Sequence, residues 1–540
     1  MARKTKYIVV TGGVLSGLGK GIATASIGHL LGSKLCIIPI KCDGYLNTDP
    51  GTMNPIEHGE VFVLDDGGEV DMDFGHYERF LGVTTKFDWN LTMGKVYQTI
   101  LDRERKGDFL GKTVQLIPHV TDEIKNWFRR IASEESADIC LIEIGGTVGD
   151  MENELYIEAV RQLSQDEGSE NVVFVHLTYV PIPTGTREQK SKPTQQSVKL
   201  LNERGIWPDV IICRCKKPLD YVIKEKVARF CNVPVDAVIS GEDAETVYEI
   251  PLHYDDEGLA EILHKKLSIY SPPKMARWRK LAESIKSPSR DVNIAICGKY
   301  TKLHDSYASI IEALTHAGAH NDAHVNLSWI ETTGIEQGEM TADEALAGID
   351  GVIVPGGFGT RGIEGKIEVV RRCRENNIPF LGICYGMQLA VIEYARNACG
   401  IADAGTTEVE QDGGSVENPV ICILPSQREV YRKGGTMRLG GQDVVLKKGT
   451  RAGKIYGKTQ IRRRFRHRYE VNPEYVQKLE ECGLVFSGTT PKGDIMQVME
   501  LPDHPYFFAT QYHPELVSRL EEPEPLFFEL VKAALERKGK

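Results

Sequence analysis

The sequence predicts an α/β protein made of two joined α/β domains. Two observations support this fold class. Short β-branched runs alternate with amphipathic stretches along the chain, which is typical of strand–helix–strand units. At 540 residues the chain also exceeds what one hydrophobic core usually serves. A stretch rich in proline, serine and basic residues divides it, so we predict domains at 1–267 and 291–540 with a linker at 268–290.

The first domain is predicted to contain a parallel sheet of the P-loop type. Its first strand runs into a glycine-rich loop at 12–21, which contains Lys20, and a helical stretch follows at 22–31. Glycines let backbone N–H groups turn toward an anion, and the helix N-terminus and the lysine add positive charge. The loop is therefore expected to bind a nucleotide triphosphate. The predicted strands are 7–11, 35–40, 139–144, 172–177 and 210–213.

The loop lacks the usual magnesium ligand, because Gly21 stands where a P-loop normally has serine or threonine. Asp71 and Asp73, or Glu143 at the end of the strand 139–144, could supply the metal ligands instead. A carboxylate at the C-terminal end of a parallel strand points into the crevice where such sheets bind ligands. Solvated surface carboxylates are the alternative interpretation.

The second domain begins a new series of strands at 292–297, 351–355 and 379–384, each followed by a glycine-rich turn and a helical stretch. The third strand leads into Gly-x-Cys-x-Gly around Cys384, ahead of a helix at 389–396. Such glycines allow a sharp turn that exposes the sulfur, and a helix N-terminus favours the thiolate. Taken alone, this cysteine could equally be a buried structural residue.

Two further segments favour a nucleophilic cysteine. The stretch 507–515 is predicted to be a strand that ends in His513, with Glu515 two residues on, a pair that suits a general base and its orienting partner. The glycine loop at 355–359 offers backbone N–H groups to a developing oxyanion. Cysteine, base, orienting carboxylate and oxyanion loop together predict acyl transfer.

These three C-terminal motifs, in this order, resemble the class I glutamine amidotransferase family, which hydrolyses glutamine through a thioester and releases ammonia. The N-terminal half resembles the CTP synthase family, and the resemblance covers nearly the whole chain. It implies an amidoligase domain at 1–267 that binds ATP, UTP and Mg²⁺, and a class I glutaminase domain at 291–540. The segments that carry it are 41–43, 49–52, 57–63, 75–80, 145–150 and 190–195.

The resemblance implies that ATP phosphorylates O4 of UTP and that ammonia, transferred between the domains, displaces the phosphate to give CTP. It also implies site residues. The catalytic residues would be Cys384, His513 and Glu515, and the oxyanion and glutamine-binding residues would be Gly357, Tyr385, Gln388, Glu408 and Arg468. The metal ligands would be Asp73 and Glu143. The ATP-binding residues would be Ser16, Gly17, Leu18, Gly19, Lys20, Gly21, Lys41, Asp73 and Arg214. The residues binding UTP or CTP would be Ser16, Asp150, Met151, Glu152, Lys190, Ser191, Lys192, Pro193, Thr194, Gln195 and Lys226.

The same resemblance implies Mg²⁺ as cofactor, GTP as allosteric activator, CTP as feedback inhibitor and a homotetramer. Composition bounds the other partners. A net charge of −11 argues against nucleic acid, despite the basic run at 462–468. No apolar stretch approaches the length needed to span a membrane. The 12 cysteines lack a disulfide framework, so we expect reduced thiols and a cytoplasmic protein.

Two alternatives stay open at this point. One is another P-loop ATP-dependent glutamine amidotransferase, such as a cobyric acid synthase relative, against which the segment 190–195 argues. The other is a nonenzymatic filament-forming homologue, against which the intact Lys20, Cys384 and His513 argue. Several residues depart from the family pattern without removing a catalytic atom: Gly44, Arg187, Tyr385, Gly405, Phe465 and Leu516.

Overall fold

The computed structural model describes residues 4–32, 34–51, 53, 59–298, 304–357, 362–423 and 437–539. The chain forms two compact units, and each of them combines two separate stretches of the sequence. The first unit contains Met1–Asp49 and Asp73–Ala282, and the second contains Pro50–Met72 and Glu283–Lys540. We call Pro50–Met72 the inserted segment. The helix α11 (Met275–Lys286) occupies much of the predicted linker, whose bounds stay a prediction.

The first unit is built on a seven-stranded sheet with the order β5-β2-β6-β1-β7-β8-β9. Every neighbouring pair in it is parallel, which confirms the predicted parallel sheet. Its central strands are aliphatic and buried, as parallel strands covered on both faces must be. The strands are β1 (Lys6–Gly12), β2 (Ile37–Asp43), β5 (Asn90–Thr92), β6 (Ile139–Ile144), β7 (Val172–Tyr179), β8 (Val210–Cys215) and β9 (Val238–Glu242).

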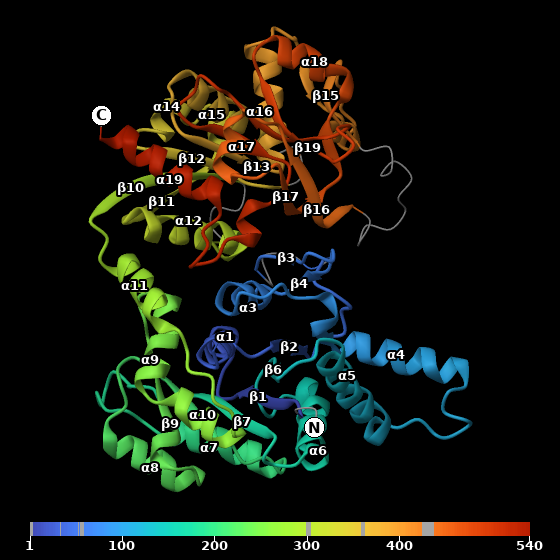
Figure 1. The fold of residues 1–540 in the computed structure, drawn as a ribbon, viewed down its shortest axis with the longest axis vertical. Coiled ribbons are helices and arrows are strands. Elements are labelled where there is room, and N and C mark those ends of the chain that lie inside the picture. The colour runs from blue at the N-terminus through green and yellow to red at the C-terminus, as the bar shows by residue number, and fades with distance from the viewer. Residues whose placement is uncertain are drawn as a thin grey trace. The chain divides into compact units, whose positions relative to one another are not determined.

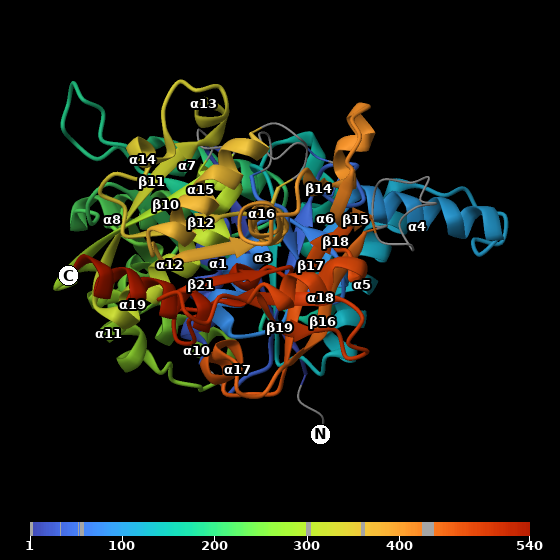
Figure 2. The ribbon, with the colours of Figure 1, turned by 90° about the horizontal axis from the view of Figure 1, so that it is seen from above.

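Helices pack around this sheet, and α4 extends away from it in both ribbon views (Figures 1 and 2). The helix α4 begins where the Thr92 side chain accepts a hydrogen bond from Lys95 N and ends at Gly107, whose φ of 84° suits glycine. The other helices of this unit are α1 (Lys20–Leu30), α3 (Asp73–Leu81), α5 (Thr121–Glu134), α6 (Glu154–Glu167), α7 (Lys192–Glu203), α8 (Tyr221–Cys231), α9 (Ile250–Asp256) and α10 (Leu259–Leu267); α4 itself is Met93–Lys106.

The second unit contains a nine-stranded sheet with the order β11-β10-β12-β13-β21-β20-β19-β16-β17. The strands from β11 to β21 are parallel, an arrangement typical of the α/β class that the sequence predicts for this domain. The strands from β20 to β17 are antiparallel and were not predicted. The strands are β10 (Arg290–Gly298), β11 (Ala323–Glu331), β12 (Gly351–Val354), β13 (Phe380–Ile383), β16 (Arg438–Leu446), β17 (Gln460–His467), β19 (Val485–Thr489), β20 (Met496–Glu500) and β21 (Phe507–Thr510).

Two smaller sheets complete this unit. One joins β14 (Ala404–Thr406), β15 (Asn418–Ile423) and β18 (Tyr469–Val471). The other is formed within the inserted segment by β3 (Phe62–Val63) and β4 (Glu69–Val70). The helices of the unit are α12 (Ala308–Asn321), α13 (Thr332–Glu336), α14 (Ala342–Ala345), α15 (Ile363–Glu375), α16 (Tyr385–Asn397), α17 (Arg451–Tyr456), α18 (Pro473–Glu481) and α19 (Pro525–Lys538).

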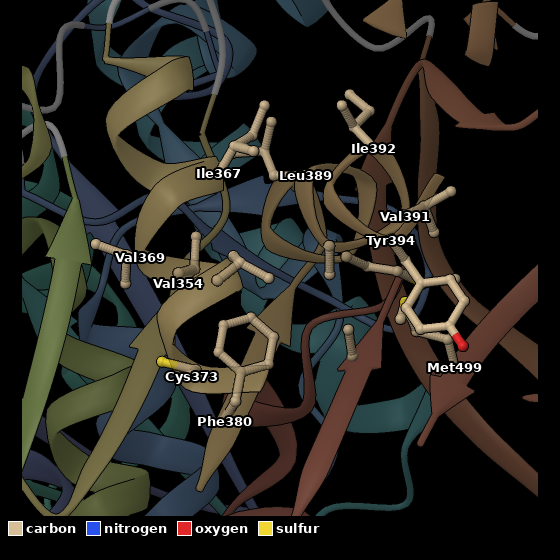
Figure 3. Close-up of a cluster of buried hydrophobic side chains, with 14 of the residues drawn as sticks. Val354, Ile367, Val369, Cys373, Phe380, Leu389, Val391, Ile392, Tyr394 and Met499 are labelled. Carbon is tan, nitrogen blue, oxygen red and sulfur yellow. The ribbon is translucent and has the colours of Figure 1, made fainter. Parts of the chain in front are cut away.

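The helix α16 is held in place by a hydrophobic cluster. Figure 3 shows Phe380 of β13 and Val354 of β12 in this cluster with Leu389 and Ile392 of α16. All residues of α16 from Tyr385 to Ala395 are buried. A helix fixed on all sides presents its N-terminus at one defined position, and Cys384 stands there.

Two further observations concern membrane-spanning helices and the cysteines. In the part of the chain that the structure describes, no helix combines the length and apolar character needed to cross a membrane. All 12 cysteines are free thiols.

Candidate active sites

Cys384 lies at a sharp turn between β13 and α16, with φ 52° and ψ −100°. A non-glycine residue rarely adopts positive φ, and such strain is typical of a nucleophile elbow. The flanking glycines are needed because the backbone approaches so closely here. A Cβ on Gly386 would lie 2.1 Å from Val354 O, and one on Gly382 would lie 2.8 Å from Gly386 C. The structure thus contains the strand-to-helix turn that the sequence predicts.

His513 and Glu515 form a hydrogen-bonded pair next to this turn. The distance between His513 Nδ1 and Glu515 Oε1 is 2.7 Å. Burial alone would lower the pKa of His513, but the charges of Glu515 and Cys384 raise it to about 10. Gly356 lies against the pair, since an added Cβ would be 2.8 Å from His513 Cε1 and 3.6 Å from Cys384 Cβ. At neutral pH the arrangement therefore favours an imidazolium beside the sulfur.

Two groups that the sequence analysis did not single out also contact the sulfur. Cys384 Sγ lies 3.6 Å from the carbonyl oxygen of Arg466 and 3.6 Å from Gln511 Nε2. The predicted glutamine-binding residue Gln388 adjoins this network, because its Nε2 donates to Tyr469 O at 2.9 Å and to Gln511 Oε1 at 3.3 Å. Both amide hydrogens of Gln388 are therefore used inside the protein, and its Oε1 is the atom left for a ligand.

A cavity of about 320 Å³ opens onto Cys384. Cys384, His513 and Glu515 line it together with Gly357, the predicted oxyanion glycine. A Cβ on Gly357 would meet no atom of the described residues within 4 Å, so they leave space beside its backbone. The inserted segment supplies another part of the lining through Met53, Glu60, Val61 and Val63.

The inserted segment is fastened to β17 by three arginines at alternate positions, whose side chains share one side of the strand. Arg462 Nε lies 3.0 and 2.9 Å from the two carboxylate oxygens of Asp65. Arg464 donates to the carbonyl oxygen of Val63 at 3.1 Å, and Arg466 pairs with Glu69 at 2.8 Å. The intervening Arg463 turns instead to Glu524. Most of the basic run at 462–468 is thus engaged within the protein.

The remaining predicted glutaminase residues lie around α16 and β17 but do not line the cavity among the described residues. Tyr385 is buried, with the ammonium of Lys366 5.3 Å from its ring centroid. Burial and the nearby charge of Glu408 raise the pKa of Tyr385. Glu408 is buried and Arg468 is half-buried. Glu57 and His58 of the predicted motifs, and Phe358 and Gly359 of the oxyanion loop, lie outside the described residues.

In the first unit, the glycine loop brings Lys20 to the start of α1. Gly17 and Gly19 adopt φ of 75° and 84°, which a side chain would disfavour. Lys20 Nζ donates to Gly146 O at 2.7 Å. Burial and the charge of Lys41 lower the pKa of Lys20, although Glu143 acts in the opposite direction. The loop therefore holds a cation where the sequence predicts a phosphate site.

Lys41 lies between the two predicted metal ligands. Its ammonium contacts Asp73 Oδ2 and lies 2.9 Å from Glu143 Oε1. Tyr77 OH donates to the other oxygen of Glu143 at 2.6 Å. Burial acts against each charge, yet Lys41 holds the pKa of Asp73 below its usual value and the carboxylates raise the pKa of Lys41.

This cluster explains the glycine that replaces the usual P-loop serine or threonine. A Cβ on Gly21 would lie 1.9 Å from Asp73 Oδ1, so the Asp73 carboxylate occupies the space that a hydroxyl side chain would need. Among the described residues, no group of three or more histidine, cysteine, aspartate or glutamate side chains is gathered as a metal site. Asp73 and Glu143 still fit Mg²⁺, because their oxygens already bind one cation and are the donor type that this metal prefers.

The predicted nucleotide-binding residues lie at several loops and helix ends of the first unit. Arg214 NH1 would be 3.9 Å from a Cβ on Gly19, which places it beside the glycine loop. Lys192 is exposed at the start of α7, and Lys190 lies 2.7 Å from Glu188. Thr194 is buried and donates to Tyr179 O at 3.1 Å. The other candidates Ser16, Asp150, Met151, Glu152 and Lys226 are exposed, while Ser191 is buried and Gln195 is half-buried with its Nε2 3.1 Å from Ser191 Oγ.

Comparison with known proteins agrees with both halves of this description. Residues 6–269 match the family model for the CTP synthase N-terminus, and residues 302–533 match that for class-I glutamine amidotransferase. The CTP synthase of Borreliella burgdorferi is 54% identical over 539 residues, which cover 99% of this chain and 100% of the relative. That of Archaeoglobus fulgidus is 52% identical over 533 residues, covering 98% of each chain.

A solved structure of the Trypanosoma brucei CTPS glutaminase domain with bound acivicin is 34% identical, covers 45% of this chain and 94% of that one, and has a TM-score of 0.42. The fold and the cysteine–histidine–glutamate site define a class I glutamine amidotransferase joined to a nucleotide-binding synthase domain. More narrowly, the chain belongs to the CTP synthase family.

Proposed function

We propose that this chain aminates UTP to CTP in an ATP-dependent reaction, with ammonia that it releases from glutamine. The observation that carries the glutaminase half is the strained Cys384 beside the hydrogen-bonded pair of His513 and Glu515. The Cys384 thiolate attacks the side-chain carbonyl carbon of glutamine. The backbone N–H groups of Gly357 and Tyr385 receive the resulting oxyanion.

His513 then completes acyl transfer by moving protons. It gives a proton to the leaving ammonia, which leaves a thioester between glutamate and Cys384. It next accepts a proton from the water that hydrolyses this thioester, and glutamate is released. Glu515 stabilises the imidazolium in both steps, consistent with the raised pKa of His513. Gln388, Glu408 and Arg468 are proposed to hold the glutamine substrate.

The synthase half transfers the γ-phosphoryl group of ATP to O4 of UTP, and ammonia then displaces this phosphate from C4. We propose that the loop 16–21, Lys41 and Arg214 hold ATP and neutralise its phosphates. Asp73 and Glu143 are the proposed Mg²⁺ ligands. When bound, the metal would offset the negative charge that develops on the phosphate oxygens. Lys41 is proposed to stabilise the same negative charge, because two carboxylates keep its ammonium group protonated.

The proposed nucleotide sites and regulators are those that the resemblance to the family implies. We propose that UTP binds at Ser16, Lys226 and 190–195, and that CTP inhibits through the same cations together with 150–152. GTP is the proposed activator, a homotetramer the proposed assembly and the cytoplasm the proposed location. The domain bounds 1–267 and 291–540 are proposed as functional units. The inserted segment falls within 1–267 in sequence but belongs to the second compact unit, where it lines part of the glutaminase cavity.

Replacing Cys384 by alanine tests the division of labour. The thiol serves only ammonia release, so Cys384→Ala should abolish CTP formation from glutamine and spare formation from added ammonia. CTP formation is followed by absorbance, with UTP and ATP held constant. A folded variant that loses both activities, or keeps the glutamine-dependent one, would contradict the proposal.

A further inference from the structure

We propose that Gln511 is a further catalytic residue of the glutaminase site, and that its side-chain amide donates a hydrogen bond to the reacting sulfur of Cys384. The inference rests on the proposed role of Cys384 as nucleophile. Gln511 follows β21 directly and stands two residues before His513. Its Nε2 lies 3.6 Å from Cys384 Sγ, and the side chain is 0% exposed.

The amide of Gln511 is fixed in the orientation that this role requires. Gln388 donates its own Nε2 hydrogen to Gln511 Oε1 at 3.3 Å, so the oxygen of Gln511 faces Gln388 and its nitrogen faces the sulfur. Gln388 is held in turn by the carbonyl oxygen of Tyr469 at 2.9 Å. A chain of neutral donors thus ends on the nucleophile.

The backbone holds the two partners in register. Cys384 N donates to the carbonyl oxygen of Thr510 at 2.6 Å, and Gln511 N donates to that of Gln497 at 2.9 Å. β13 and β21 are parallel neighbours, so their carboxyl ends bring the cysteine and the glutamine to the same edge of the sheet. The contact between amide and sulfur is therefore built into the sheet and needs no closure of a loop.

The amide counteracts a second contact of the sulfur. The carbonyl oxygen of Arg466, 3.6 Å away, accepts a hydrogen bond and therefore favours the protonated thiol. An N–H donor favours the thiolate, and burial strengthens this preference because water cannot replace it. Among the described residues, the charged and titratable groups near the sulfur include His513 with Glu515, Glu60 in the same cavity lining, and the guanidinium of Arg466 with its partner Glu69. They also include His467, whose pKa burial lowers to about 3.

Gln497 provides a matched control. It is a fully buried glutamine on β20, and its backbone carbonyl oxygen accepts a hydrogen bond from Gln511 N. Within the described residues, neither its side-chain nitrogen nor its side-chain oxygen has a hydrogen-bond partner. Replacing it by methionine changes a buried amide of the same size without removing a contact to the sulfur.

The test compares Gln511→Met, Gln511→Glu and Gln497→Met in the full chain. Alkylation of Cys384 by iodoacetamide is followed by mass spectrometry of its peptide from pH 6 to 10. CTP formation from glutamine and from ammonia is measured in parallel. Gln511→Glu keeps the oxygen that accepts from Gln388, so it removes the donor with little change in packing.

Both Gln511 variants should shift half-maximal alkylation to higher pH and lower kcat/KM for glutamine by roughly 10- to 100-fold, the value of a charge-assisted hydrogen bond. Ammonia-dependent activity should stay unchanged, and Gln497→Met should match the wild type in every assay. Unshifted alkylation in both Gln511 variants would overturn the proposal, as would an equal loss in Gln497→Met. Neither result would affect the Cys384→Ala test, which decides the proposed function separately.

Discussion

The ion pair between Arg466 and Glu69 should contribute to glutaminase stability much more than the neighbouring pair between Arg462 and Asp65. The side chains of Arg466 and Glu69 are 23% and 5% exposed, so replacing Arg466 by methionine leaves a buried carboxylate without this partner. Losing this partner should lower the free energy of unfolding by about 3 kcal/mol. Arg462 and Asp65 are 52% and 32% exposed, and Arg462→Met should cost about 0.5 kcal/mol because water screens the pair.

Thermal unfolding and product ratios distinguish the two variants. For a unit of this size, Arg466→Met should lower the melting temperature of the glutaminase transition by on the order of 6 °C or more, and Arg462→Met by about 1 °C. Because Arg466 also lines the cavity, its loss should lower the amount of CTP formed per glutamine hydrolysed. Ammonia-dependent turnover should not change. Equal shifts in the two variants would refute the argument from burial.

Three further predictions concern other parts of the chain. Lys20→Ala should suppress CTP formation from both glutamine and ammonia, since phosphoryl transfer precedes either nitrogen source; normal ammonia-dependent turnover would contradict the phosphate site. Lys192→Ala should raise both the KM for UTP and the inhibition constant for CTP roughly tenfold or more. Glu152→Ala should weaken CTP inhibition and leave the KM for UTP unchanged. A Lys192→Ala variant with altered CTP inhibition but an unchanged KM for UTP would contradict a shared triphosphate site. Burial raises the pKa of Glu470 to about 7 from 4.5, so the folded state binds the extra proton and stability is lost as pH rises through 7. Glu470→Gln should remove this slope, worth on the order of 3 kcal/mol, from melting curves between pH 4.5 and 8, and an unchanged slope would exclude Glu470 as its source.

The parallel strands could be predicted because each is a short aliphatic run. The expected strand at 139–144 is β6 residue for residue, and the other predicted strands differ from the observed ones by a few residues at their ends. The antiparallel half of the second sheet carries no such signal. β16 contains two adjacent glycines, and β17 contains four arginines in eight residues, a composition typical of an exposed loop. The arginines at alternate positions of β17 can be explained only in the folded protein, where they bind the inserted segment.

Local geometry was predictable where neighbouring residues share a motif, as in the turn at Cys384 and the hydrogen-bonded pair of His513 and Glu515. Cys384, His513 and Glu515 lie in compact motifs whose spacing already implies their roles. Lys41 joins carboxylates 32 and 102 positions away along the chain, a contact that only the folded sheet creates. Gln511 lay within the motif at 507–515, but a neutral amide carries no reactive group to draw attention to it. The roles assigned to all of these site residues, in both domains, stay predictions.

The inserted segment affects what an isolated glutaminase fragment of this enzyme would contain. It supplies part of the wall around Cys384 and the partners of three arginines, yet in the sequence it lies between β2 and α3 of the first unit. A glutaminase fragment cut from the C-terminal sequence alone would carry a cavity with one side open to solvent. Inhibitors selected on such a fragment would be shaped to a surface that the intact polypeptide keeps covered.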